Sequence, residues 1–331
     1  MKKFCCFFFC LALSLVPVSA VSRTLIVCGD TVMINAQYDG VFISGDFDFH
    51  WKDQLISSHP LDSVQVHDMI IEANGNMISS CKELNRVISE ISITKNFIDV
   101  KVLRNQIEHK ARLYLYFDEN DNTFKTGFYI KDHISGVGTL TYYDPLHHSY
   151  GALGHEITEK STGKRAEVHL GHILLGKVTS VVPSVINQPG EKISRSTDMI
   201  LGNILINNEF GLFGKTNVEL KGRELEIALQ HQIHPGKAVL LTVIDGTNLM
   251  EVDVEITKVN LQSSQGIKGI EFKITDQRLI EKTGGIVQGM SGSPILQNGR
   301  IIGAVTHMIP SSPTRGYGVF IEWMLYYSDQ I

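Results

Sequence analysis

From residue 124 to the C-terminus, the chain consists of short β-prone runs that turn-forming residues interrupt. Gly, Pro, Asn and Asp separate the runs, and helical periodicity is nearly absent before Ile321 to Tyr327. Runs of this length and spacing are typical of antiparallel barrels and sandwiches, so this half predicts a mainly β fold. The clearest runs are Thr126 to Ile130, Gly138 to Tyr143, Lys177 to Val182, Val239 to Val243, Val252 to Val259 and Ile270 to Ile274.

A serine stands on a glycine-rich corner within this half. The stretch Gly284 to His307 reads GGIVQGMSGSPILQNGRIIGAVTH, with apolar β-prone runs around a Gly-x-Ser-Gly-x-Pro corner and an Asn-Gly hairpin turn. Glycines at 289 and 292 let the backbone turn its N–H groups towards one point, as an oxyanion hole requires. Ser291 is therefore a candidate nucleophile, although an isolated match of this length is more often a surface turn.

The corner resembles the nucleophile region of chymotrypsin-like serine peptidases. The longer match, with TRGYGVFIEWML after it, is similar to the SpoIVB-type sporulation peptidases, and the resemblance covers Gly127 to the C-terminus. It implies a chymotrypsin-like double β-barrel with the active site between the barrels. It also places the nucleophile at Ser291 and the oxyanion hole at the backbone N–H groups of Gly289 and Ser291, and it leaves Ser293 as a structural turn residue.

A serine nucleophile needs a base, and 13 histidines compete for that role. His155 ends the segment YGALGH, and TLTYYDP precedes it. This pattern is similar to the family stretch GTLTFYDP…YGALGH, whose histidine is the general base, so the resemblance selects His155. His169 and His172 are the next candidates. Thr306 and His307, on the strand after the nucleophile, are expected to line the substrate pocket.

The acid that orients the base rests on a narrower match. The segment KITDQRL resembles the family's KITDxxLL and places the acid at Asp276, fifteen positions before Ser291 (291 − 276). The order His155, Asp276, Ser291 is shared with chymotrypsin, but the acid lies much nearer the serine than in that enzyme. Asp144 and Asp132 remain alternatives, and Asp276 could instead cap a short helix that begins at residue 277.

The first half of the chain has a different pattern. Asp68 to Ile78 reads as a strand, an Asn-Gly turn and a second strand. A helical pattern follows, with Ser79 or Ser80 as a possible N-cap. Two alternating strands come next, at Phe97 to Leu103 and Ala111 to Tyr116.

This order resembles a PDZ domain of the bacterial type, over residues 40 to 117. The resemblance implies a groove between a strand at Val41 to Ser44 and the helix at Glu83 to Ile91, in which a peptide C-terminus or an extended segment adds as a strand. The peptide-binding residues would be Gly40, Val41, Phe42 and Ile43. A small α+β domain without a ligand is the alternative. Residues 21 to 39 are interpreted as a short leader with at most one strand, residues 118 to 123 as a linker, and residues 124 to 331 as the peptidase domain.

The N-terminus carries an export pattern in residues 1 to 20. Two lysines precede an apolar run from Phe4 to Val16, and Pro-Val-Ser-Ala follows. Retention as an N-terminal anchor is the alternative. Cleavage would leave only Cys28 and Cys81, which we expect to be free structural thiols rather than a disulfide. A formal net charge of −5 without a basic run gives no reason to expect a nucleic-acid partner.

The resemblance also implies a function. Similar proteins are exported serine endopeptidases that process themselves and cut the extracytoplasmic part of a membrane-bound regulator, which restrains an intramembrane metalloprotease during sporulation. They act between the two forespore membranes. No cofactor is expected, and the His-x-x-His spacing of His169 and His172 lacks the further ligands of a metal site. The rival hypothesis is a catalytically inactive PDZ-type binding or scaffold protein at the membrane surface.

Overall fold

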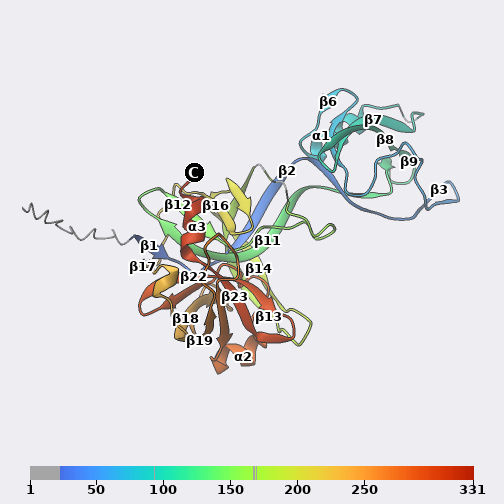
Figure 1. Ribbon diagram of the computed structural model, residues 1–331. Helices are drawn as coiled ribbons and strands as arrows, with labels where there is room; N and C mark the ends of the chain where they lie inside the picture. Colours follow the sequence, from blue (N-terminus) through green and yellow to red (C-terminus); the bar gives the residue numbers. More distant parts are fainter. Residues whose placement is uncertain (1–22, 93, 167, 169) are drawn as a thin grey trace, which may run out of the picture.

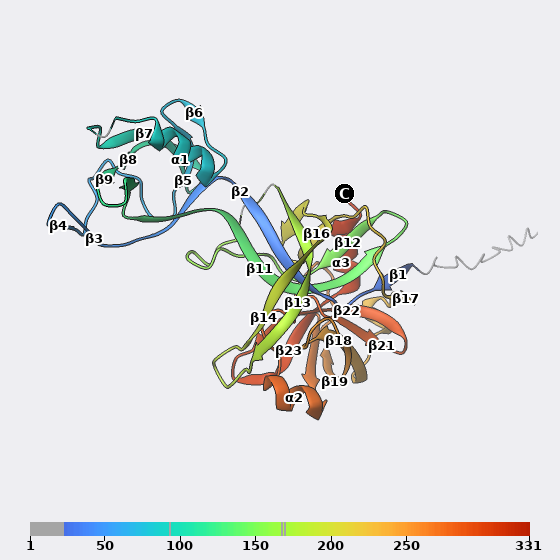
Figure 2. The same ribbon diagram turned by 180° about the vertical axis from the view of Figure 1, so that it is seen from behind.

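The computed structural model describes residues 23–331 except 93, 167 and 169, so the predicted export signal lies outside the described residues. Within this range, none of the helices combines the length and the apolar character that a membrane crossing requires. The chain is mainly β, as the sequence predicts. Figures 1 and 2 show a large body and a smaller one, joined by the two long strands β2 (Thr31–Asp46) and β11 (Phe128–Asp144).

The upper part of the large body is a half-barrel around one apolar core. β11 pairs with β2 and β12, and β13 pairs with β2 and β14. Its core contains Val32, Ile34, Leu140, Ile173 and Leu212, all nearly or fully buried. Besides β2 and β11, its strands are β1 (Thr24–Val27), β12 (Ser149–Ala152), β13 (Leu170–Val182), β14 (Glu191–Asn203), β15 (Ile206–Asn208), β16 (Gly211–Lys215) and β17 (Arg223–Glu226).

Residues interpreted as a short leader contribute two strands to this half-barrel. β1 pairs with β11 and β17, and Val27 lies opposite Tyr142. In β2, Val32, Ile34 and Ala36 are buried, while Asn35 and Gln37 are exposed. This alternation is the period-two pattern of a half-buried strand. The domain boundary expected at residue 40 therefore falls inside a continuous strand.

The smaller body consists of residues 47–127, inserted between β2 and β11, together with the adjoining ends of these two strands. Its helix begins where the sequence predicts, because the Ser80 hydroxyl accepts a hydrogen bond from the Glu83 N–H at 3.2 Å. Residues 118–123, the expected linker, form the turn of a hairpin. The elements are β3 (Phe49–Trp51), β4 (Gln54–Ile56), β5 (Met69–Ala73), β6 (Asn76–Met77), α1 (Cys81–Ser89), β7 (Phe97–Arg104), β8 (Ile107–Tyr114), β9 (Tyr116–Asp118) and β10 (Thr123–Lys125).

The lower part of the large body is a closed six-stranded barrel, in the order β18-β19-β20-β23-β22-β21. Asn298 and Gly299 both have positive φ, so the predicted hairpin turn between β21 and β22 is confirmed. The half-barrel and this closed barrel together confirm the predicted double-barrel class. The elements are β18 (Gly236–Val243), β19 (Leu249–Val259), β20 (Ile270–Ile274), α2 (Gln277–Thr283), β21 (Pro294–Gln297), β22 (Arg300–Ile309), β23 (Ser312–Phe320), α3 (Ile321–Ser328) and a 3₁₀ turn at Gln230–Gln232.

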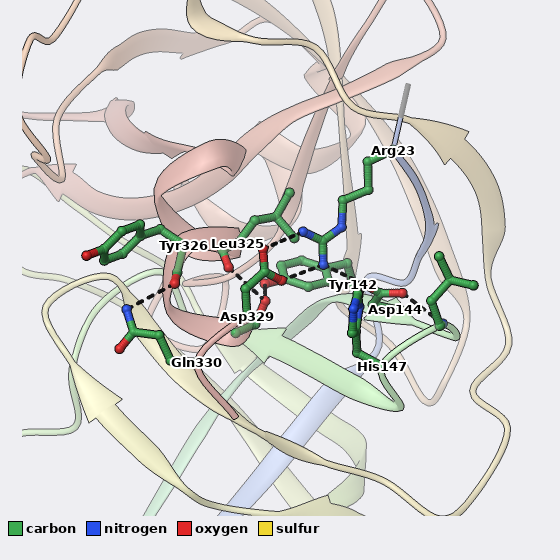
Figure 3. Close-up of polar contacts among 10 residues, drawn as sticks. Arg23, Tyr142, Asp144, His147, Leu325, Tyr326, Asp329 and Gln330 are labelled. Carbon is green, nitrogen blue, oxygen red and sulfur yellow. Dashed lines mark hydrogen bonds and ion pairs between the residues drawn. The ribbon is translucent and has the colours of Figure 1, made fainter. Parts of the chain in front are cut away.

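An ionic clasp ties the start of β1 to the end of α3 (Figure 3). The Arg23 guanidinium donates to the buried Asp144 at 2.5 Å and to Asp329 at 2.6 and 2.7 Å. Burial alone would raise the pKa of Asp144, but hydrogen bonds from His147 and Arg23 lower it below its ordinary value. Ligand atoms of Asp144, His147 and Asp329 lie within 4.8 Å of one another. Because Arg23 already supplies a positive charge there, the group is better described as a clasp than as a metal site.

Candidate active site

The glycine-rich corner lies on the loop between α2 and β21, where the two barrels meet. Its turn is closed by hydrogen bonds from the Ser293 N–H to the Met290 carbonyl at 2.9 Å and from the Gly292 N–H to the Val305 carbonyl at 2.8 Å. Gly292 has φ +90, and a Cβ there would lie 2.2 Å from the Thr139 carbonyl oxygen. Only glycine fits this position, since β11 presses directly against the corner.

Two backbone N–H groups of the corner have no acceptor in the described part of the chain. They belong to Gly289 and Ser291, whereas the N–H groups of residues 288, 290, 292 and 293 all donate to carbonyl oxygens. A pair of unpaired N–H groups beside a serine is the arrangement that an oxyanion hole needs. The oxyanion hole at Gly289 and Ser291 stays a prediction, for which these two N–H groups are available.

The two serines of the corner have different surroundings. The Ser291 side chain is half-buried, and its hydroxyl donates to the Thr306 carbonyl at 3.2 Å. Ser293 is fully buried, with its hydroxyl 3.2 Å from Thr242 Oγ1 and 3.4 Å from Thr139 Oγ1. Only Ser291 has the exposure that a nucleophile requires. Ser293 occupies the structural position that the sequence predicts.

The predicted base, His155, lies beside β22, the strand that also accepts the hydrogen bond from the Ser291 hydroxyl. A Cβ at Gly154 would lie 2.9 Å from the Val305 carbonyl oxygen and 3.3 Å from Thr306 Cγ2, so His155 follows a residue packed on β22. The His155 Nδ1 lies 2.7 Å from the Glu156 carbonyl oxygen. Because a carbonyl only accepts, Nδ1 carries the proton and Nε2 is the free acceptor. Burial lowers the pKa of His155, which keeps the ring neutral.

The predicted pocket residues lie next to this pair in different orientations. The His307 ring centroid is 5.6 Å from that of His155, and the His307 side chain is exposed. Thr306 is buried, and its hydroxyl oxygen lies 3.1 Å from the Tyr317 carbonyl oxygen inside the barrel. The structure therefore gathers His155, Ser291, Thr306 and His307, but Thr306 presents its backbone rather than its side chain.

The structure does not bring the predicted acid to the base. The Asp276 carboxylate accepts hydrogen bonds from the Arg278 backbone and guanidinium at 2.6 to 3.1 Å, and it caps α2. Among the described residues, no carboxylate forms a hydrogen bond with His155. The alternative acids are engaged elsewhere, Asp144 with Arg23 and Asp132 with the Cys81 N–H at 2.8 Å. As the triad acid, Asp276 stays a prediction.

The predicted peptide-binding strand has neighbours on both edges. Val41 pairs with Ile70 of β5, and Ile43 pairs with Ile130 of β11. Phe128 and Ile130 pack in the same core as α1, on the side where the sequence predicts an open groove. A peptide that added to this edge would have to displace β11.

Phe42 also lines a cavity of about 770 Å³ between the inserted body and the loop after His155. Met69 and His67 contribute from the inserted body, and Lys164 and Arg165 contribute from the loop. The cavity therefore combines an apolar wall, two exposed basic side chains and the buried carboxylate of Glu159, which is paired with Lys131.

Sequence reasoning missed one residue beside the corner. Lys192 is 3% exposed, and its methylene groups pack against Gly289. Nothing in the surrounding letters, PGEKIS, indicates burial, because lysine is rarely buried. The two cysteines in the described range, Cys28 and Cys81, are free thiols.

Comparisons with known proteins give one strong match. A model of the SpoIVB peptidase S55 family matches residues 122–325, more than half of the chain. The active form of the Rv3671c protease from M. tuberculosis is 12% identical, with a TM-score of 0.36 over 58% of this chain and 72% of that chain. Its inactive form is 15% identical, with a TM-score of 0.31 over 59% and 84%. A human heparin binding protein is 10% identical, with a TM-score of 0.27 over 55% and 74%. The search of curated proteins found no match.

Proposed function

Because the chain belongs to the SpoIVB peptidase S55 family, a family of serine proteases, we propose that it is an exported, self-processing serine endopeptidase of sporulation signalling. Its substrate is the extracytoplasmic part of a membrane-bound regulator, and cleavage releases an intramembrane protease. It acts between the two forespore membranes, secreted or held by its N-terminus. The observation that carries the catalytic part is the corner at Ser291, with its two unpaired N–H groups and a neutral histidine nearby.

The site residues suit acyl transfer. Ser291 Oγ attacks the scissile carbonyl carbon, and its proton passes to Nε2 of His155, which is the free acceptor. The carbonyl oxygen becomes an oxyanion that the N–H groups of Gly289 and Ser291 stabilise. His155 then gives the proton to the departing amine, and water hydrolyses the acyl-enzyme by the reverse sequence. The Ser291 hydroxyl must first rotate away from the Thr306 carbonyl, as catalytic hydrogen bonds often form only with substrate bound.

Orientation of the base has two candidate sources. In the described conformation the Glu156 carbonyl holds the proton-bearing Nδ1 of His155. The resemblance of KITDQRL to the family segment supports a carboxylate in that role, at Asp276. Either partner fixes the same tautomer, which is the requirement of the mechanism.

For the inserted body we propose peptide binding in the manner of a PDZ domain. An apolar C-terminal side chain would contact Phe42 and Met69 in the cavity of about 770 Å³, and its carboxylate would face Lys164 and Arg165. Support comes from the apolar and basic side chains of the lining, since a peptide C-terminus combines an apolar side chain with a carboxylate. The Glu159 carboxylate, which also lines the cavity, is already paired with Lys131. This cavity adjoins the loop that follows His155, so an occupant would contact both bodies.

The catalytic proposal is tested with a fluorophosphonate and two matched variants. In the labelling reaction an Oγ–P bond forms, the P–F bond breaks, fluoride leaves and the proton passes to His155. The wild type should gain the mass of one phosphonyl group, and Ser291→Ala should gain none. Ser293→Ala, which removes the neighbouring hydroxyl, should still be labelled and should still cleave peptides. Labelling of Ser291→Ala together with an inert Ser293→Ala would refute the assignment.

The rival hypothesis is an inactive PDZ-type scaffold. It predicts that the fluorophosphonate labels neither the wild type nor any variant, while peptide binding to the inserted body persists. The intact corner, with its nucleophile and unpaired N–H groups, favours the enzyme.

A further inference from the structure

A turn between β13 and β14 holds the loop that leads to Ser291. The Ser184 hydroxyl donates to the Ile286 carbonyl at 2.6 Å, and the Gln288 N–H donates to the Gly190 carbonyl at 2.8 Å. The Lys192 N–H in turn donates to the Gln288 carbonyl at 2.9 Å. Residues 286–288 are therefore fixed to the half-barrel immediately before the corner. This backbone contact places the Lys192 side chain beneath the nucleophile.

The Lys192 side chain fills the space next to Gly289. A Cβ at Gly289 would lie 3.1 Å from Lys192 Cδ and 3.2 Å from Lys192 Cβ, and φ there is +93. The Lys192 Nζ donates to Thr242 Oγ1 on β18 at 3.0 Å. The lysine thus spans from β14 under the proposed oxyanion hole to the closed barrel.

Side-chain hydroxyl groups link Thr242, which binds the Lys192 amine, to the glycine-rich corner. Ser293 Oγ lies within hydrogen-bond distance of both Thr242 Oγ1 and Thr139 Oγ1. The Thr139 hydroxyl donates to the Gly289 carbonyl at 2.8 Å, and the Thr141 hydroxyl donates to the Gly292 carbonyl at 2.7 Å. The Lys192 amine is therefore one end of a buried polar network that fixes the peptide groups on both sides of Ser291.

The network suits an uncharged amine better than an ammonium. The side chain contacts Gly289 on the loop and Thr242 on β18, and Val137 of β11 and Ser293 lie next to these two residues; none of the four is charged. In the described part of the chain, Lys192 has no ion pair, and an ammonium would bring three N–H donors to one acceptor. Burial accordingly lowers the pKa of Lys192 to about 7.

We propose that Lys192 is a positioning residue of the nucleophile loop: its uncharged amine holds the loop in the described conformation, and protonation of that amine opens the loop and slows acylation of Ser291. This inference rests on the proposed serine peptidase activity. Lys192 is buried behind the loop and does not contact substrate, so it acts through Gly289 and Ser293. Its effect should appear as a second titration, in addition to that of His155.

The test is the rate at which a fluorophosphonate labels Ser291, measured by mass between about pH 5 and 9. In the wild type both Lys192 and His155 must be uncharged, so the rate should fall about tenfold per pH unit below about pH 7, and about a hundredfold per unit once the pH also lies below the lowered pKa of His155. In Lys192→Met only His155 titrates, so the fall should be about tenfold per pH unit. Below about pH 7, the ratio of variant to wild-type rate should grow about tenfold with each unit.

Two further variants keep the test decisive. Lys177→Met, at an exposed position on β13, should follow the wild type. Lys192→Arg keeps a charge at every pH and should be labelled slowly throughout.

If the labelling rates of the wild type and Lys192→Met fall identically with decreasing pH, or if Lys192→Arg is labelled fast, the inference is overturned while the peptidase assignment stays intact. Absence of labelling in the wild type at every pH would instead refute the proposed function. Should Lys192→Met fail to fold, a wild-type rate that stays constant between about pH 8 and 6.5, above the lowered pKa of His155, would still overturn the inference.

Discussion

Replacement of Lys192 by Met should raise the stability of the protein at neutral pH. Met fills a similar volume, but it removes an amine that is 3% exposed and lacks a charged partner. The pKa of Lys192 lies at about 7 in the folded protein, compared with 10.5 for the free side chain. At pH 7 and below, this difference corresponds to a destabilisation on the order of 5 kcal/mol, since each pKa unit is worth about 1.4 kcal/mol.

The sign of the pH dependence follows from proton binding in the two states. Between about pH 7 and 10.5, the unfolded chain carries a proton on Lys192 that the folded protein lacks, so the free energy of unfolding rises with pH. The wild type should therefore gain about 1.4 kcal/mol per pH unit relative to Lys192→Met over this window. Below the folded pKa both states are protonated, and the difference between the two proteins should be constant.

Urea unfolding of the two proteins at several pH values measures this difference. Other groups titrate in the same range, but they are common to both proteins and cancel in the comparison. Lys177→Met serves as the control for loss of an exposed lysine. A free-energy difference between wild type and Lys192→Met that stays constant from about pH 7 to 9 would show that Lys192 keeps its proton when folded, and it would refute the reasoning.

Two other substitutions test the site and the clasp. Asp276→Asn should lower kcat only a few-fold, because in the described conformation the carboxylate caps α2 and binds Arg278; a loss on the order of 10⁴ in kcat would show that it reaches His155 in the working enzyme. Arg23→Met should lower the free energy of unfolding by about 3 kcal/mol at pH 7, because Asp144 stays buried without its cation. Since the pKa of Asp144 is lowered in the folded protein, this stabilisation is present above the ordinary carboxyl pKa of 3.8 and should vanish as the pH falls through the lowered value; an undiminished difference in acid would contradict the clasp.

Local patterns in the sequence were sufficient to predict where several elements begin or turn. Ser80 before an amphipathic run predicts the start of α1, and Asn298-Gly299 predicts the turn between β21 and β22, because both signals depend on neighbouring residues alone. In the family motif the first serine is the nucleophile, and in the structure the first serine is half-buried and the second fully buried. These features require no knowledge of distant contacts.

Features that depend on distant pairing could not be predicted. The alternation from Val32 to Ala36 shows that one face is buried, but not that β2 pairs with β11 and β13, which lie about 100 to 140 residues later. The spacing of Asp276 from Ser291 along the chain likewise does not fix the direction of its carboxylate. Lys192 is buried only because Gly289 and Thr242 close over it, and no pattern in its own segment indicates these partners.

β11 is the element that relates the inserted body to the chemistry. Its first residues, including Phe128, belong to the core of the inserted body, whereas Thr139 and Thr141 bind the carbonyl groups of Gly289 and Gly292. The Thr139 carbonyl also accepts the Leu153 N–H at 3.1 Å, two residues before the base. One continuous strand therefore contacts the core of the inserted body, the nucleophile corner and the segment that carries His155. A displacement of residues 128–131 would consequently act on a strand that fixes both catalytic segments, which gives the inserted body a physical connection to the active site that a separate, flexibly linked domain would lack.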